Sequence, residues 1–150
     1  MHAVTRNGPR FTVQNPEKLL YLWATYRKIK NDLIYQVKSP LPPKSMESLM
    51  PPGTVFAAFS AWRFLFPHQA PPADYDHIYV YSSSPQEIKK RFPPKRGTPN
   101  LFVLQPDPFL KRYGQATCLS QTFADLWNLP EWYAGPYLQN LQEKIHGILA

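Results

Sequence analysis

Cysteine is nearly absent from this sequence, and its scarcity removes two common ways of holding a small fold together. Cys118 is the only cysteine in 150 residues, so the chain cannot form an internal disulfide or a multi-cysteine zinc site. Three of the four histidines, His2, His68 and His146, stand apart from other metal-binding side chains. We therefore expect no structural metal and a fold that depends on its hydrophobic core.

Long apolar runs and glycine-rich loops are also missing. No segment reaches the roughly 18 consecutive apolar residues that span a bilayer, and residues 1–10 lack the apolar stretch of a signal peptide. The six glycines are spread through the chain and form neither a GxxxxGK[ST] nor a GxGxxG phosphate loop. These absences predict a cytoplasmic protein without membrane contact and without a cofactor.

Acidic residues are outnumbered by basic ones, ten against 17, which gives a formal charge of +7. This balance points weakly toward an acidic partner such as nucleic acid. Basic side chains are densest in residues 89–112, where Asp107 alone opposes them. The run is either a solvated face or a contact surface for phosphate or for an acidic protein. Its candidate contact residues are Lys89, Lys90, Arg91, Lys95, Arg96, Lys111 and Arg112.

Apolar and proline residues, in contrast, are plentiful. A hydrophobic fraction of 43% and an aromatic fraction of 15% argue against disorder, and this length is typical of one domain. Many of the 18 prolines cluster at residues 40–43, 51–52, 71–72 and 93–94, between patterned segments. Prolines at such places act as rigid connectors, so we expect a single ordered domain.

The first half of the chain contains clear helix and strand signals. Residues 11–13 alternate as a short strand does. Asn15, Pro16 and Glu17 are typical of a helix start, and apolar side chains at positions 19–29 predict the face by which that helix packs. Residues 33–37 favour a strand, residues 45–50 a helical turn, and the apolar run 55–66 a buried helix.

The second half predicts further strands and two C-terminal helices. Residues 77–82 and 100–105 are strand-like, residues 85–92 favour a short helix, and residues 116–119 a third short strand. Ser120 is placed to cap the next helix, and Pro130 to open the last one, with a kink or a break near Gly135. The resulting fold class is α/β or α+β, with a short central sheet flanked by helices.

Three groups of side chains have the residue types of a metal-binding or catalytic site, and we favour a structural explanation for each. The segment 74–77 (DYDH) has metal-capable side chains, but aspartate is also common in turns. Asp107 with Glu87 and Lys89 has the residue types of a metal-dependent nuclease, although the order along the chain is unusual. Cys118 would need a nearby histidine base to act as a nucleophile. We predict no catalytic, cofactor-binding or metal-binding residues.

The stretch of residues 117–145 holds two of the four tryptophans, Trp127 and Trp132, together with Tyr133. Exposed, these rings would form a platform for bases or for a partner protein. Aromatic residues at helical spacing are more often part of a core. We therefore interpret the stretch as a packing unit rather than as a functional surface.

Several stretches together resemble the effector portion of the AbiEi family of antitoxin-type transcriptional regulators. The matching pieces are residues 11–24 (FTVQNPEKLLYLWA), 52–66 (PGTVFAAFSAWRFLF), 77–92, 100–106 and 119–141 with its central DLWNLPEWYA. They occur in the expected order and cover most of the chain. None of them is a catalytic signature.

The resemblance implies a prokaryotic regulatory domain that neutralises or senses a nucleotidyltransferase-like toxin encoded in the same operon. Members of this family usually carry a winged helix that binds the promoter before this region. Here 14 residues precede Asn15, which are too few for a winged helix. The resemblance therefore does not imply DNA binding by a recognition helix. We interpret residues 1–14 as the remnant of a wing or as a flexible arm. Either a longer gene product supplies the winged helix, or the chain is a stand-alone relative.

Three hypotheses follow from the residues and the resemblance. The first is a non-enzymatic antitoxin-like regulatory domain that binds a cognate toxin. The second is a basic accessory module that binds nucleic acid. The third and weakest is a metal-dependent nuclease built on Asp107, which an Asp107→Ala variant with unchanged activity would exclude.

Overall fold

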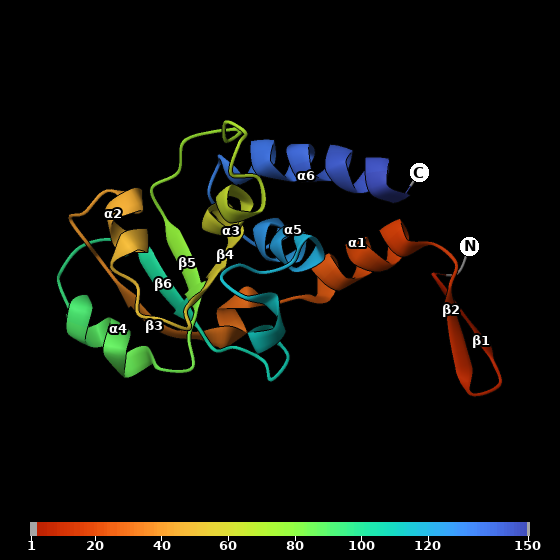
Figure 1. The fold of residues 1–150 in the computed structure, drawn as a ribbon, viewed down its shortest axis with the longest axis horizontal. Coiled ribbons are helices and arrows are strands. Elements are labelled where there is room, and N and C mark those ends of the chain that lie inside the picture. Colours follow the sequence, from red (N-terminus) through yellow and green to blue (C-terminus); the bar gives the residue numbers. More distant parts are fainter. Residues whose placement is uncertain (1–2, 150) are drawn as a thin grey trace.

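The computed structural model describes residues 3–149, apart from the side chains of Lys111 and Leu149. This part of the chain forms a mixed α/β fold with a two-stranded and a four-stranded sheet. Figure 1 shows the four-stranded sheet between two sets of helices, with the two-stranded hairpin projecting from one end. No helix in the described range is long and apolar enough to cross a bilayer.

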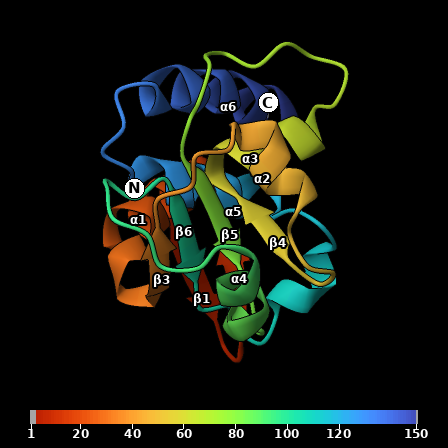
Figure 2. The same ribbon diagram turned by 90° about the vertical axis from the view of Figure 1, so that its left-hand side faces the viewer.

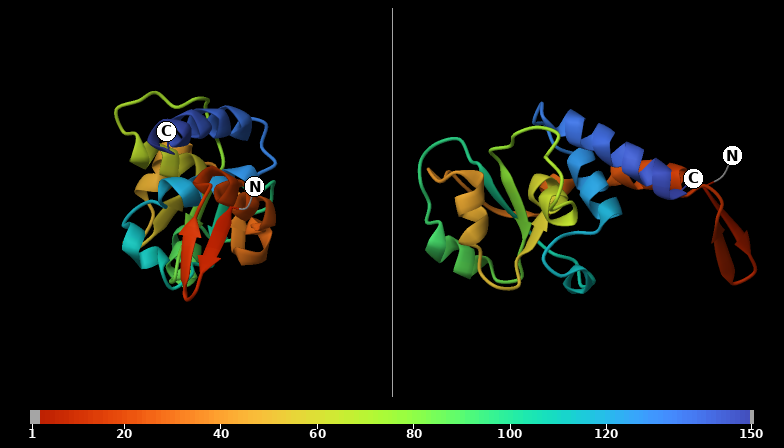
Figure 3. Two further views of the ribbon diagram at one scale, coloured as in Figure 1. Left: turned by 90° about the vertical axis from the view of Figure 1, so that its right-hand side faces the viewer. Right: turned by 45° about the horizontal axis from the view of Figure 1, so that its top comes forward.

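The N-terminal hairpin consists of strands β1 (Val4–Asn7) and β2 (Arg10–Val13). The strands pair antiparallel, with Val4 opposite Val13 and Asn7 opposite Arg10. Gly8 adopts a positive φ of 64° in the tight turn between them. The predicted strand at residues 11–13 is confirmed, whereas its partner was not predicted. The right-hand view in Figure 3 shows the hairpin extending beyond the end of helix α1 (Pro16–Tyr26).

The central sheet has the strand order β3-β6-β5-β4 (Figure 2). Its strands are β3 (Leu33–Val37), β4 (Val55–Ala57), β5 (Ile78–Tyr81) and β6 (Leu101–Leu104). The central strands β5 and β6 are parallel, and the edge strands β3 and β4 run antiparallel to their neighbours. The side chains of β5 are buried on both faces, as expected of a central strand covered by helices.

Helices cover both faces of this sheet. The short helices α2 (Pro43–Ser48) and α4 (Pro85–Arg91) lie on one face (Figures 1 and 2). There Met46 and Ile88 pack against Ile78, Val80 and Val103. Helices α1, α3 (Ala58–Leu65), α5 (Leu119–Trp127) and α6 (Ala134–Leu149) lie on the other side. The 3₁₀ turns η1 (Ile29–Asp32) and η2 (Leu110–Tyr113) complete the described elements.

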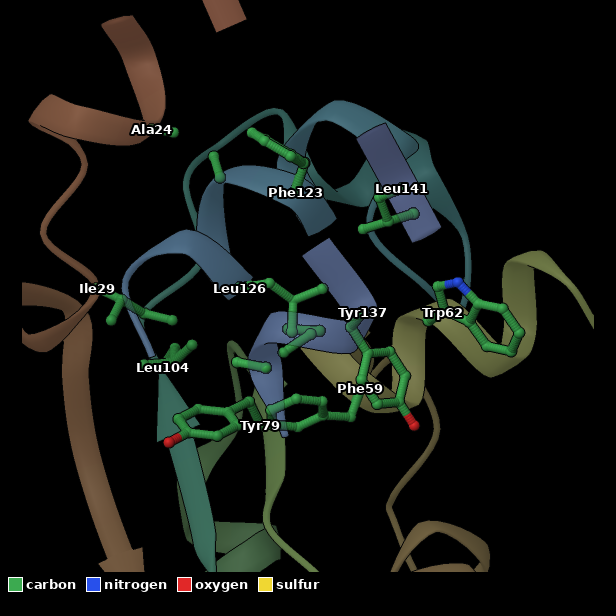
Figure 4. Packing of buried hydrophobic residues seen from close by; sticks show 14 of the residues in the cluster. Ala24, Ile29, Phe59, Trp62, Tyr79, Leu104, Phe123, Leu126, Tyr137 and Leu141 are labelled. Atoms are coloured by element: carbon green, nitrogen blue, oxygen red, sulfur yellow. The ribbon is translucent and has the colours of Figure 1, made fainter. Parts of the chain in front are cut away.

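The larger hydrophobic core fills the space between the sheet and the helices α1, α3, α5 and α6. Phe59 and Trp62 from α3 meet Tyr137 from α6 at ring distances of 5.1 Å and 5.8 Å (Figure 4). Phe123 from α5 and Tyr79 from β5 belong to the same cluster. Aromatic pairs in these geometries add to the stabilisation from buried area. The core therefore joins the C-terminal helices to the sheet.

One predicted segment of the first half divides into two elements in the structure. The apolar run 55–66 is not one helix, because its first three residues form strand β4. Ala58 turns the chain directly into α3 with a φ of 52°. A buried strand followed by a buried helix has the same apolar pattern as a longer buried helix, so periodicity cannot separate them.

The C-terminal predictions also need correction. Residues 116–119 contribute a single bridge, Ala116 to Phe56, rather than a strand. Helix α5 already includes Ser120, and its N-cap residue Cys118 makes no capping side-chain bond. The last helix begins at Ala134, so Pro136 lies in its first turn, where a missing N–H leaves no helical bond unmade. Pro130 therefore does not open this helix, and the expected break near Gly135 is present as the helix start at Ala134 rather than as a kink.

Candidate functional site

The predicted basic run does not form one surface. Lys89, Lys90 and Arg91 lie on α4, whereas Arg112 lies in η2, which follows β6. Figure 2 shows α4 in front of the sheet and the turquoise turn of η2 well to one side. The side chain of Lys111 falls outside the described part of the structure. The seven candidate residues thus divide into two groups. The α4 group, on α4 and the loop after it, is Lys89, Lys90, Arg91, Lys95 and Arg96, and the η2 group is Lys111 and Arg112.

Several basic side chains of the α4 group already have partners. The ammonium of Lys89 lies 5.3 Å from the ring centre of Tyr35, and Lys90 is 3.4 Å from the carboxylate of Glu87. Arg91 donates a 2.8 Å hydrogen bond to the carbonyl of Leu49. These contacts occupy part of the hydrogen-bonding capacity that phosphate recognition would need.

Lys95 and Arg96 lie in the exposed loop between α4 and β6. Arg91 and Lys95 line a cleft of about 400 Å³ together with Lys38. In the η2 group, the guanidinium of Arg112 lies 5.5 Å from the ring centre of Phe109. The cleft beside Lys38 is thus the place where the structure brings two of the seven candidates together.

The candidate catalytic side chains each have other partners in the structure. Asp107 accepts hydrogen bonds from the backbone N–H groups of Phe109 and Leu110, at 2.7 Å and 3.1 Å. Glu87 instead pairs with Lys90. Among residues 3–149, no group of three or more histidine, cysteine, aspartate or glutamate side chains could hold a metal ion. Asp107 therefore has the turn-shaping contacts that its flanking prolines suggested.

A buried ionic network lies between α1, α5 and the sheet. Asp125 on α5 accepts a 2.8 Å hydrogen bond from the Tyr81 hydroxyl, and Arg27 lies 3.3 Å from its other oxygen. Gln121 donates to Asp125 at 3.0 Å, and Arg27 also bonds Asp32. Full burial raises the pKa of Asp125 to about 6, and the nearby Arg27 opposes that rise. Asp125 is therefore ionised above that pH, with donors on both oxygens.

This network borders a small polar cleft of about 310 Å³. Arg27, Tyr81 and Gln121 line it, and Asp107 lies at the same cleft. Every ionised side chain of the network is paired within the fold. The arrangement therefore fixes α1 and α5 on the sheet, and it leaves no unpaired acid to serve as a catalytic base.

A second polar group lies beside a larger cavity of about 620 Å³. Its members are Tyr79 on β5, His77 just before β5, and Glu131 in the segment between α5 and α6. Glu131 accepts a 2.7 Å hydrogen bond from Nδ1 of His77 and another from the hydroxyl of Tyr79. The side chain of Glu131 is only 6% exposed. The bond to Glu131 raises the pKa of His77.

The ionisation of Glu131 follows from the same contacts. Burial by itself raises the pKa of Glu131, but the hydrogen bonds from His77 and Tyr79 outweigh it and leave the pKa lowered. Burial and the neighbouring carboxylate raise the pKa of the Tyr79 hydroxyl, which therefore stays a donor. A carboxylate paired with a histidine of raised pKa is nearly neutral as a unit at mildly acidic pH.

The predicted metal-capable segment 74–77 contributes only His77 to this group. Asp76 instead accepts a 2.6 Å hydrogen bond from Tyr133. Tyr75 donates to Glu47 at 2.6 Å and also bonds Arg63. These contacts hold the segment as an extended connector between α3 and β5, without the turn that the sequence suggested.

Helix α1 carries an exposed apolar stripe that was expected to be buried. Leu19, Leu22, Trp23 and Tyr26 are 37–79% exposed, and their i, i+3, i+4, i+7 spacing places them on one side of the helix. Leu20, Tyr21 and Ala24 pack on the core from the opposite side. The apolar pattern of α1 therefore serves two faces, of which the sequence prediction foresaw one.

The apolar surface continues beyond α1. Val13 on β2 and Trp127 at the end of α5 are 47% and 43% exposed. A shallow hollow of about 670 Å³ is lined by Val13, Pro16, Leu19, Leu20, Trp23 and Ser120. Trp132 is also exposed, at 80%, whereas its neighbour Tyr133 is buried. The expectation that these aromatic side chains are mainly packed inside therefore holds for Tyr133 and is wrong for Trp132. Trp127 is intermediate, because it contacts Tyr21 and Phe123 but stays 43% exposed.

Two signals in the sequence pointed to these features. Asp125 interrupts an otherwise apolar helix pattern, and a charge at a core position requires a partner. The apolar positions of α1 are too many for one helix face. No comparable signal marks Glu131, because its burial depends on the path of the chain between α5 and α6.

Comparison with known proteins gives no relative from which function could be transferred. The chain matches no family model, and neither the curated proteins nor the solved structures include a match. The class that the fold and these surfaces define is a mixed α/β domain with an exposed apolar helix face.

Proposed function

We propose that this chain is a non-enzymatic regulatory domain that binds a partner protein through the exposed stripe of α1. The resemblance to the effector portion of AbiEi-type antitoxin regulators suggests which partner, a nucleotidyltransferase-like toxin from the same operon. The observation that carries the proposal is the row formed by Leu19, Leu22, Trp23 and Tyr26. An amphipathic helix presents such a row when it binds in an apolar groove of another protein.

Charge at the end of the stripe indicates the character of the partner's groove. Lys28 and Lys30 are exposed just after α1, while Arg27 is engaged with Asp32 and Asp125. A groove that receives this helix would therefore be apolar along its length, with acidic side chains near the C-terminal end of α1. That arrangement would steer association and set the direction of the helix in the groove.

Co-expression with the product of the neighbouring gene tests the proposal. We expect the two proteins to copurify, and we expect the chain to restore growth of cells that express the neighbouring protein. Failure of every neighbouring product to copurify, together with no protection, would contradict the antitoxin function.

A basic nucleic-acid-binding module is the second candidate, and the hairpin is the observation that favours it. Arg6 and Arg10 lie on β1 and β2, which project from the body of the protein (Figure 3). Lys95 and Arg96 are exposed elsewhere. Binding to duplex DNA should then weaken with a log–log slope of about 0.9 per phosphate contacted as salt rises. An absence of binding at low salt would exclude this function.

A further inference from the structure

The cavity beside Glu131 lies where the helical layer leaves part of the sheet uncovered. Its floor comes from β3, β5 and β6, and its walls come from η1 and from residues 128–131 between α5 and α6. Helix α3 covers β4 and β5 on the same face. No helix of comparable length lies over β3, so a volume of about 620 Å³ stays open there. Volumes of this size are typical of small-molecule sites.

The floor of the cavity is apolar and aromatic. Phe102 on β6 and Tyr79 on β5 are register partners, and their rings stack at 4.6 Å with an interplanar angle of 11°. Leu33 and Leu104 line the cavity beside them. On β3, a register irregularity between Leu33 and Tyr35 puts Leu33 and Gln36 on the same face, although they are three residues apart. The irregularity therefore widens the floor.

One polar group in the wall has an unmet hydrogen-bonding requirement. Oε1 of Glu131 accepts from His77 and Tyr79, but its Oε2 is buried and has no partner in the described part of the chain. An unpaired buried carboxylate oxygen costs about 1–3 kcal/mol or more. The same side chain lines the apolar cavity, so a ligand donor that displaces the atoms covering Oε2 would satisfy this oxygen and stabilise the fold.

We propose that this cavity binds a small, neutral, planar aromatic heterocycle that carries an amino group. The ring packs against Phe102 and the aliphatic walls, and the amino group donates to Oε2 of Glu131. His77, the residue before β5, contacts Glu131 and balances its charge, so the site favours a neutral donor over a cation. The binding site is separate from the α1 stripe, and the inference does not depend on the proposed function.

The direct test uses 2-aminopurine as the probe and purine, which lacks the amino group, as the matched control ligand. The fluorescence of 2-aminopurine reports binding to the full chain, and competition reports binding of purine. We expect saturable binding of 2-aminopurine that is about tenfold tighter than that of purine, as one hydrogen bond to a charged group provides. Equal affinities, or an absence of saturable 2-aminopurine binding, would overturn the proposal.

Three variants locate the bound probe. Gln36→Trp fills the cavity from the exposed edge of β3 and should weaken 2-aminopurine binding by about tenfold or more. Ile34→Trp lies on the same strand but does not line the cavity, and it should leave binding unchanged. Glu131→Gln should reduce the preference for 2-aminopurine over purine. Equal effects of Gln36→Trp and Ile34→Trp would show that the probe binds elsewhere, even if Glu131→Gln fails to fold.

Discussion

Nε of Arg27 lies 3.3 Å from Oδ1 of Asp125, although 98 positions separate the two residues in sequence. Arg27 follows the last turn of α1, and Asp125 lies within α5. Tyr81 on β5 donates to Asp125 and accepts from Arg27 at 2.8 Å. Three separate elements therefore meet at one buried ionic contact, which fixes the position of the helix that carries the exposed apolar stripe.

Arg27→Met should destabilise the fold because it leaves the carboxylate of Asp125 buried without its cation. We expect a loss of about 3 kcal/mol in the free energy of unfolding at pH 8, measured by urea denaturation. The loss should shrink at about pH 5, because Asp125 has a pKa raised to about 6 and is then protonated.

Arg63→Met provides a matched control for that loss. Arg63 pairs with Glu47 at 2.6 Å, but its side chain is twice as exposed as that of Arg27, 30% against 15%. We expect a smaller loss for this variant, because the remaining Glu47 is 8% exposed rather than fully buried and keeps its hydrogen bonds from Ser60 and Tyr75. Equal losses in the free energy of unfolding for Arg27→Met and Arg63→Met would contradict the conclusion that burial of the ion pair sets the size of the loss.

His77→Gln should change how stability depends on pH. His77 has a pKa raised above 6.5, so its contribution is complete below pH 6.5 and is lost as pH rises through the folded value. Glu131 has a pKa lowered below 4.5, so its contribution is present above pH 4.5 and is lost as pH falls through the folded value. The pair therefore stabilises most between these two pH values.

Urea denaturation of the wild type and His77→Gln across pH checks this window. The difference in free energy of unfolding should be largest between pH 4.5 and 6.5 and should decline at higher pH. A difference that stays constant up to about pH 9 would show that the imidazole contributes by packing alone.

Phe59→Ala and Trp132→Ala compare a buried with an exposed aromatic side chain. Phe59 is 1% exposed and contacts four other aromatic rings, whereas Trp132 is 80% exposed. We expect Phe59→Ala to lower the free energy of unfolding by about 3–5 kcal/mol. Trp132→Ala should stay within about 0.5 kcal/mol of the wild type. A large loss from Trp132→Ala would mean that its ring packs more closely than the structure shows.

Much of the fold was predictable because its local signals agree with its packing. Asn15 accepts a hydrogen bond from the N–H of Lys18, as its sequence context predicted for a helix cap. The strands at Leu33–Val37, Ile78–Tyr81 and Leu101–Leu104 also match the alternating or apolar runs that indicated them. The mixed α/β class followed from this order of elements.

The remaining features depend on contacts between distant parts of the chain. Nothing near Glu131 in sequence indicates that His77 and Tyr79 are its partners, and those contacts create the polar wall of the cavity. The charge pattern likewise could not show that α4 and η2 hold separate parts of the basic run. Such pairings arise from the sheet topology, which brings segments together that are far apart in sequence.

The affinity of the chain for the neighbouring gene's product, measured with variants of the α1 stripe, tests the central proposal most directly. Leu22→Glu places a charge within the stripe, and Leu49→Glu places one at a similarly exposed apolar residue after α2, 45% against 42% exposed. We predict that Leu22→Glu weakens binding by about a hundredfold, near 2.7 kcal/mol, while Leu49→Glu binds as the wild type does. Equal affinities for the two variants would contradict the proposal that α1 is the binding surface.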